Sequence, residues 1–175
     1  MATCSSPTQC RGDVYRIARE NKALEPFASL GANTFPNGID ISTDGRTLFA
    51  ATALGLRTVR IADRHVAEVK GMPGERPPLI DGLYFVDNSL IAVQPFEPAR
   101  VIVRYGLSNA HTIVTAEVIA AEHPQHTQPT TGVVVGNEFY YIANSQLQFF
   151  RAMYKDGAYD RSALTDVVVL KTPIR

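Results

Sequence analysis

The chain has no tryptophan and only two cysteines, Cys4 and Cys10, which both lie in its polar first ten residues. We expect two dispensable thiols in a loose tail, with a disulfide or a metal pair as the alternative. An excess of either charge is also missing, because Lys plus Arg and Asp plus Glu both total 17. Binding to nucleic acid or to an acidic membrane requires a basic face. We therefore expect neither partner.

Long apolar segments are absent as well. No run reaches the roughly 18 residues that cross a bilayer, and MATCSSPTQC at the start has neither the basic flank nor the apolar stretch of a secretory signal. The expected location is therefore the cytoplasm. Hydrophobic residues make up 45% of the chain and charged residues 19%, which is typical of a globular protein with one buried core.

Helical periodicity is missing too. ARENKALEPF contains good helix formers, but Pro26 and the short length limit it to a turn or two. The rest of the chain consists of short β-branched and aromatic runs separated by Gly, Asp and Asn, which is the pattern of strands. The sequence predicts an all-β fold.

The strand candidates repeat. NGIDISTDGRTLFAAT, DGLYFVDNSLIAV and TGVVVGNEFYYIAN each contain a polar residue, a Gly, a short strand, a polar turn and a second strand. The turns Asp44-Gly45, Asp87-Asn88 and Gly136-Asn137 suit tight hairpins because they tolerate positive φ. Two more candidates follow each hairpin: LRTVRIA and VAEVK, then RVIVRYGL and TIVTAEVIA, then LQFFRAMY and LTDVVVLK.

The spacing of the repeat indicates a β-propeller. Gly38 and Gly82 are 44 residues apart, and Gly82 and Gly132 are 50 apart. A period of about 40–50 residues with four strands is that of a propeller blade. We expect four-stranded antiparallel sheets at roughly 35–70, 79–122 and 131–171, and a partial sheet at 12–28. This makes about three and a half blades over 12–175, after an unstructured leader at 1–11.

The polar residue before each Gly has a predicted place. The first strand of a blade lines the central channel, so Asn37, Asp81 and Thr131 should converge at the channel mouth. Carboxylate and amide oxygens there are hard ligands for Ca²⁺. Asn-Gly and Asp-Gly are also common turn dipeptides, and the sequence leaves both interpretations open. Gln94 and Arg100 face either the same mouth or solvent in a loop.

Three stretches resemble a known family. FPNGIDISTDGRTLFAA resembles the Pro-Asn-Gly blade of the senescence marker protein/gluconolactonase family (regucalcin and its bacterial lactonase relatives). IDGLYFVDNSLIAV is similar to the next blade, and QPTTGVVVGNEFYYIANSQ to a last blade of bacterial members. The resemblance implies a six-bladed propeller that holds one divalent cation, Ca²⁺ first, with Zn²⁺ or Mn²⁺ as alternatives. It implies metal ligation by Asn37 and Asp81, and for Asp81 also the role of general base in lactone hydrolysis.

The chain departs from this family in two respects. The family's remaining metal carboxylate is a Glu of the first blade, and no Glu-Gly-Pro entry occurs here. The chain also holds about half of the repeats. We therefore expect the C-terminal half of a longer protein, as from a truncated gene, that is a weak or inactive lactone hydrolase on its own. We expect it to hold its cation weakly and to act on a lactone or sugar acid. Its open sheet edges should make it self-associate. The alternative is a non-catalytic propeller fragment that acts as a binding or interaction module.

Overall fold

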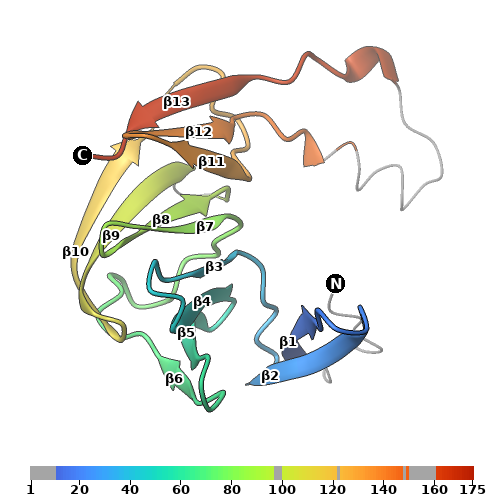
Figure 1. The fold of residues 1–175 in the computed structure, drawn as a ribbon. Helices are drawn as coiled ribbons and strands as arrows, with labels where there is room; N and C mark the ends of the chain where they lie inside the picture. The colour runs from blue at the N-terminus through green and yellow to red at the C-terminus, as the bar shows by residue number, and fades with distance from the viewer. Residues whose placement is uncertain (1–10, 97–99, 122, 148, 150–160) are drawn as a thin grey trace.

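The described part of the chain is built from strands. The computed structural model describes residues 11–96, 100–121, 123–147, 149 and 161–175, and no helix in these residues is long and apolar enough to cross a membrane. Figure 1 shows the strands as an arc. They are β1 (Arg11–Ile17), β2 (Leu24–Ala32), β3 (Ile39–Ile41), β4 (Thr47–Thr52), β5 (Gly55–Arg60), β6 (Val66–Glu68), β7 (Leu83–Val86), β8 (Ser89–Gln94), β9 (Val101–Asn109), β10 (Thr112–Ala120), β11 (Gly132–Val135), β12 (Glu138–Ile142) and β13 (Val169–Pro173), with a 3-10 turn η1 at Arg161–Ala163.

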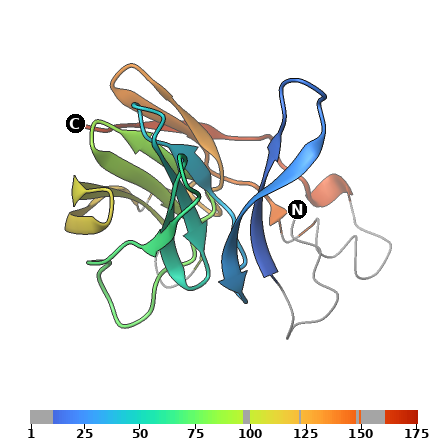
Figure 2. The same ribbon diagram turned by 60° about the horizontal axis from the view of Figure 1, so that its bottom comes forward.

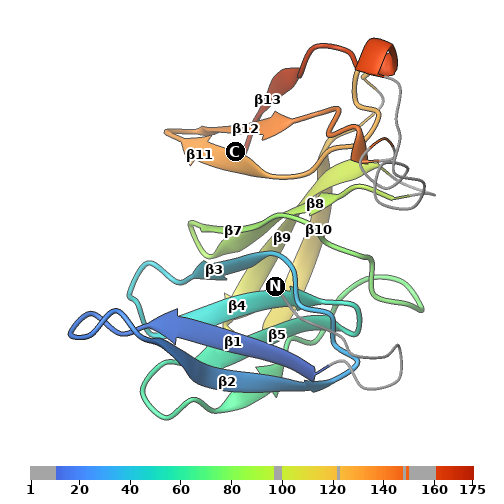
Figure 3. The ribbon, with the colours of Figure 1, turned by 90° about the vertical axis from the view of Figure 1, so that its right-hand side faces the viewer.

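The strands form separate antiparallel sheets that follow one another along the chain. β3 to β6 make the first blade, β7 to β10 the second, and β11, β12 and β13 the third, while β1 and β2 form a two-stranded sheet. Figure 3 shows these sheets layered one above another. The inner strands β3, β7 and β11 lie on the concave side of the arc in Figure 1. The predicted all-β, partial β-propeller architecture is confirmed.

The third sheet differs from its prediction. β13 pairs directly with β12, for example Tyr141 with Leu170, so no strand from the predicted run LQFFRAMY lies between them. Residues 148 and 150–154 of that run lie outside the described residues. Within its described part, the amide of Phe149 donates to the carbonyl of Gln146 at 3.0 Å, which closes a turn. The place beside β12 is taken by the later run instead.

The hairpin turns have the conformation that their residues predict. Gly45 and Gly136 have φ of 70° and 60°, and Asp87 and Asn88 have φ of 45° and 58°. The two consecutive positive φ values at Asp87 and Asn88 match the right-handed twist of the strands that they join. These turns fix the register of the inner two strands in each blade.

The core lies between sheets. Phe49 and Leu90 belong to a buried cluster that joins the first and second blades, and Phe49 stacks on Phe85 with ring centroids 5.3 Å apart. Ile91 and Phe139 belong to the cluster between the second and third blades. A smaller cluster joins the β1–β2 sheet to the first blade, and Figure 2 shows this sheet beside the first blade's flank. Each blade is therefore held by its neighbours.

Candidate functional site at the blade entrances

Three polar residues hold the same place in the three blades. The amides of Asn37, Asp81 and Thr130 each donate to a carbonyl near the end of the blade's second strand, at 3.0, 2.9 and 3.1 Å; the acceptors are Ala51, Val93 and Ile142. By this register the third equivalent residue is Thr130, one position earlier than the sequence repeat places it. We call Asn37, Asp81 and Thr130 the mouth cluster.

The side chains of the mouth cluster are bonded to one another. Asn37 Nδ2 donates to Asp81 Oδ1 at 2.6 Å, and Thr130 Oγ1 donates to Asp81 Oδ2 at 2.5 Å. Asn37 is exposed, whereas Asp81 and Thr130 are half-buried. Because each residue comes from a different blade, the Asp81 carboxylate links all three at their entrances.

Glycines allow the blades to approach this closely. A Cβ placed on Gly38 would lie 2.6 Å from the Leu83 nitrogen and 2.8 Å from the Asp81 carbonyl oxygen. A Cβ on Gly82 would lie 3.1 Å from the carbonyl oxygen of Thr130. Neither residue has a positive φ, so these glycines serve close approach rather than an unusual backbone conformation.

Thr131 lies beside the cluster, and among the described residues its hydroxyl makes no hydrogen bond to Asp81. Its hydroxyl is 2.7 Å from the hydroxyl of Tyr84, which also accepts a bond from the Gly132 amide at 2.7 Å. Asp40 makes a similar link between the first two blades, because its Oδ2 accepts from the Phe85 amide at 2.7 Å. Polar bridges therefore run between neighbouring inner strands.

The structure places Gln94 and Arg100 in other surroundings. Gln94 is 9% exposed, and its Nε2 donates to the Tyr105 hydroxyl at 2.8 Å, on the flank of the second blade that packs toward the first. Arg100 is exposed, and its charge helps to lower the pKa of His126, after the larger effects of burial and of His123. No described hydrogen bond joins either residue to the mouth cluster.

The sequence repeat missed Thr130 and Tyr84. A one-residue shift in the third entrance cannot be seen in an alignment on Gly, because the residue before Gly132 is also a threonine. The doublet Thr130-Thr131 was the only signal available. Tyr84 sits inside a run that is also explained by packing, and its ring lies 4.9 Å from that of Phe139.

The mouth cluster gathers oxygen-bearing side chains. The Asp81 carboxylate, the Asn37 amide oxygen and the Thr130 hydroxyl are hard oxygen donors of the kind that bind Ca²⁺, which takes six to eight of them. The Asn37 amide now turns its nitrogen to Asp81, so ligation requires the amide to rotate. Within the described residues, no group of three or more His, Cys, Asp or Glu could hold a metal. The cluster supplies four oxygen donors at most, two of them from the Asp81 carboxylate.

Comparisons with known proteins give the fold. No protein-family model matches the chain, and none of the curated proteins matches it. Among solved structures, a luciferin-regenerating enzyme is similar, with a TM-score of 0.59 and 16% identity. The similarity covers 95% of this chain and 52% of the enzyme. This chain has the fold of a partial β-propeller. It spans about half the length of the enzyme that it resembles.

Proposed function

We propose that the chain is the C-terminal half of a gluconolactonase-like propeller of the senescence marker protein family. Its reaction is cation-dependent lactone hydrolysis, and its substrate is a lactone or sugar acid. One observation carries this proposal: Asn37 and Asp81, which the family resemblance pairs as metal ligands, are 44 residues apart in sequence and in direct side-chain contact at 2.6 Å. Their contact also gives a role to the Asn37 side chain, which stands just before β3.

The residues of the mouth cluster would divide the chemistry. A bound divalent cation would polarise the lactone carbonyl. Asp81 would take a proton from the attacking water as the water oxygen bonds to the carbonyl carbon. The ring carbon–oxygen bond would then break, and the departing oxygen would take the proton from Asp81, which restores the carboxylate. Thr130 holds Asp81 Oδ2, which leaves Oδ1 directed toward the exposed Asn37.

The proposed cation is Ca²⁺, with Zn²⁺ or Mn²⁺ as alternatives. Oxygen donors favour Ca²⁺ or Mn²⁺ over Zn²⁺, whose structural sites are built mostly from nitrogen and sulfur. With at most four oxygen donors from the mouth cluster, water or a further chain must complete the six to eight that Ca²⁺ takes. We therefore propose weak binding.

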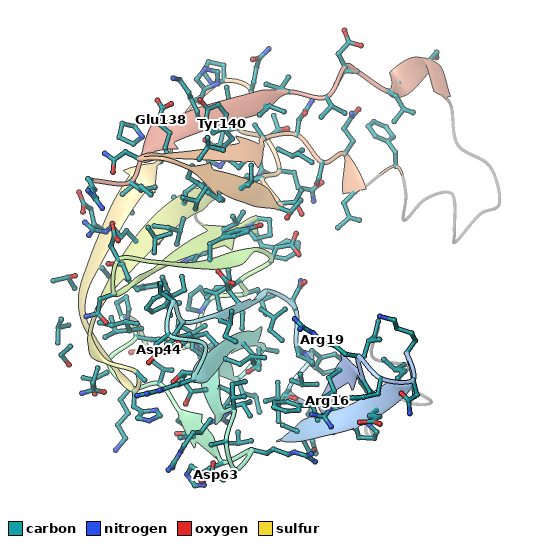
Figure 4. The ribbon with its side chains drawn as sticks, in the orientation of Figure 1. Arg16, Arg19, Asp44, Asp63, Glu138 and Tyr140 are labelled. Carbon is teal, nitrogen blue, oxygen red and sulfur yellow. The ribbon has the colours of Figure 1, made fainter. Side chains whose placement is uncertain are left out.

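A lactone panel tests the proposal. The purified chain is assayed by pH-stat for acid release from five- and six-membered lactones, with EDTA or with added Ca²⁺, Zn²⁺ or Mn²⁺. We expect slow, cation-dependent turnover that Asp81→Asn abolishes, because an amide cannot act as a base. Asp63→Asn is the matched control, since Asp63 lies in the turn between β5 and β6 (Figure 4). Turnover that survives Asp81→Asn would contradict the proposal.

A second candidate function is a non-catalytic interaction module. Alternate residues of two inner strands are exposed: Ile39 and Ile41 on β3 are 48% and 46% exposed, and Val133 and Val135 on β11 are 55% and 57% exposed. Among the described strands, β1 pairs only with β2, so its other edge is open there. Apolar faces and an open edge favour self-association. A dimer by light scattering, with no turnover on any lactone, would favour this function.

A further inference from the structure

A pocket of about 870 Å³ lies between the second blade and the segment that joins β6 to β7. The blade wall consists of cross-strand partners: Gln94 with Val101, Val103 with Val118, and Tyr105 with Ala116. Direct partners, and residues two apart on a strand, point to the same face. These six side chains therefore make one continuous surface, which none of the mouth cluster residues lines.

The opposite wall is stiff and apolar. It includes Pro73, Pro77 and Pro78, whose rings restrict the backbone. Pro77 Cβ lies 3.6 Å from the position that a Cβ on Gly55 would take, so this wall packs against the start of β5. The pocket falls within the range of about 300–1,000 Å³ that is usual for small-molecule sites.

The blade wall carries a buried polar pair with unused capacity. Tyr105 is 1% exposed and Gln94 is 9% exposed. The bond from Gln94 Nε2 to the Tyr105 hydroxyl leaves the amide oxygen and the hydroxyl proton without a partner among the described residues. If the amide is turned over, the pair again retains a donor and an acceptor. Burial raises the pKa of Tyr105, so its hydroxyl stays protonated at neutral pH and can donate to a ligand.

An arginine supplies charge to the same pocket. Arg76 lines the pocket and is exposed, and it makes no hydrogen bond or ion pair with any other described residue. The neighbouring Glu75 does not line the pocket. The pocket thus combines apolar walls, a buried donor–acceptor pair and an accessible cation.

We propose that this pocket binds a small apolar carboxylate that also carries a hydroxyl group. A hydroxyl both donates and accepts, so it satisfies Gln94 and Tyr105 in either amide orientation, while the carboxylate pairs with Arg76. The flat or branched body of the ligand packs against the prolines and valines. The site is independent of the proposed lactone chemistry, since Asp81 takes no part in it.

The test uses 6-hydroxy-2-naphthoic acid as the probe. Because the chain has no tryptophan, naphthol fluorescence is read without interference, and calorimetry measures the affinity. We expect 2-naphthoic acid, which lacks the hydroxyl, to bind about threefold to tenfold more weakly, as the loss of one hydrogen bond implies. We expect 2-naphthol, which lacks the carboxylate, to bind about twofold to fivefold more weakly, since the lost ion pair is exposed.

Variants assign these differences to residues. Tyr105→Phe should remove most of the advantage of the hydroxylated probe over 2-naphthoic acid. Arg76→Gln should weaken both carboxylates about threefold and leave 2-naphthol unchanged. Arg19→Gln, in the turn between β1 and β2 (Figure 4), is the charge-matched control.

A second variant, which fills the pocket, keeps the test decisive if Tyr105→Phe fails to fold. Ala116 is exposed on β10, so Ala116→Phe should occupy the pocket and weaken every probe more than tenfold without altering the circular dichroism spectrum. Asp81→Asn should leave probe binding unchanged, which separates this site from the lactonase proposal. Equal affinity for the three probes, or full binding by Ala116→Phe, would overturn the assignment.

Discussion

Gly38→Ala should push the first two blades apart at the mouth cluster. The added Cβ would meet three backbone atoms, the Leu83 nitrogen at 2.6 Å, the Asp81 oxygen at 2.8 Å and the Gly82 carbonyl carbon at 2.9 Å, where ordinary contacts begin at 3.4 Å. Backbone cannot rotate away as a side chain can. We expect overpacking to cost about 1–3 kcal/mol of unfolding free energy.

The same displacement should weaken the site. Asn37 Nδ2 and Asp81 Oδ1 are 2.6 Å apart, and a retreat of about 0.8 Å would take this bond to the limit of about 3.2 Å or beyond. We therefore expect Gly38→Ala to lose cation affinity as well as stability. Urea unfolding followed by circular dichroism measures the first effect, and calorimetric Ca²⁺ titration the second.

Gly45→Ala is the matched control. Gly45 has open space around it but a φ of 70°, so alanine should cost about 1 kcal/mol through backbone strain alone and leave the mouth cluster intact. If Gly38→Ala unfolds at the same urea concentration as the wild type, a Cβ at this position does not clash with the second blade, and the reasoning fails.

Four further outcomes are expected. Thr130→Val removes the bond to Asp81 and should lower the unfolding free energy by about 1 kcal/mol in urea titrations, whereas Thr127→Val should not. Phe139→Ala empties a fully buried position between two blades and should cost about 3–5 kcal/mol by the same assay. Burial lowers the pKa of His126 below 6.5, so the stability contributed by the neutral side chain should be full above about pH 6.5 and fall as the pH drops further. Urea midpoints measured from pH 7.5 to 5 should therefore depend less on pH in His126→Phe than in the wild type. Size-exclusion chromatography with light scattering should show association, and a monodisperse monomer would refute the expectation drawn from the exposed inner strands.

Local rules explain how much of the fold could be predicted. Asp87-Asn88 and Gly45 adopt positive φ because of their own chemistry, and the short apolar runs between such turns have little choice but to pair as hairpins. The period of the turns then sets the blade boundaries. These predictions needed no knowledge of distant contacts, and the first two blades follow them within a few residues.

Local rules were insufficient for the third blade. LQFFRAMY and LTDVVVLK have similar strand character, so propensity cannot decide which run lies beside β12. Pairing along Glu138–Ile142 is a long-range choice, and β13 occupies that edge. Buried Ile174, next to β13, packs in the cluster between the second and third blades, which shows what the later run gains there.

The candidate site divides in the same way. The sequence by itself determined that Asn37 and Asp81 occupy equivalent entrances, because both precede a Gly at the start of a repeat. Only the tertiary structure decided that Thr130 rather than Thr131 bonds to Asp81, and that Gln94 turns to Tyr105. The physical reason is that a strand alternates its faces from one residue to the next. A single step in register, set by hydrogen bonds to the paired strand β12, therefore decides which side chain meets which.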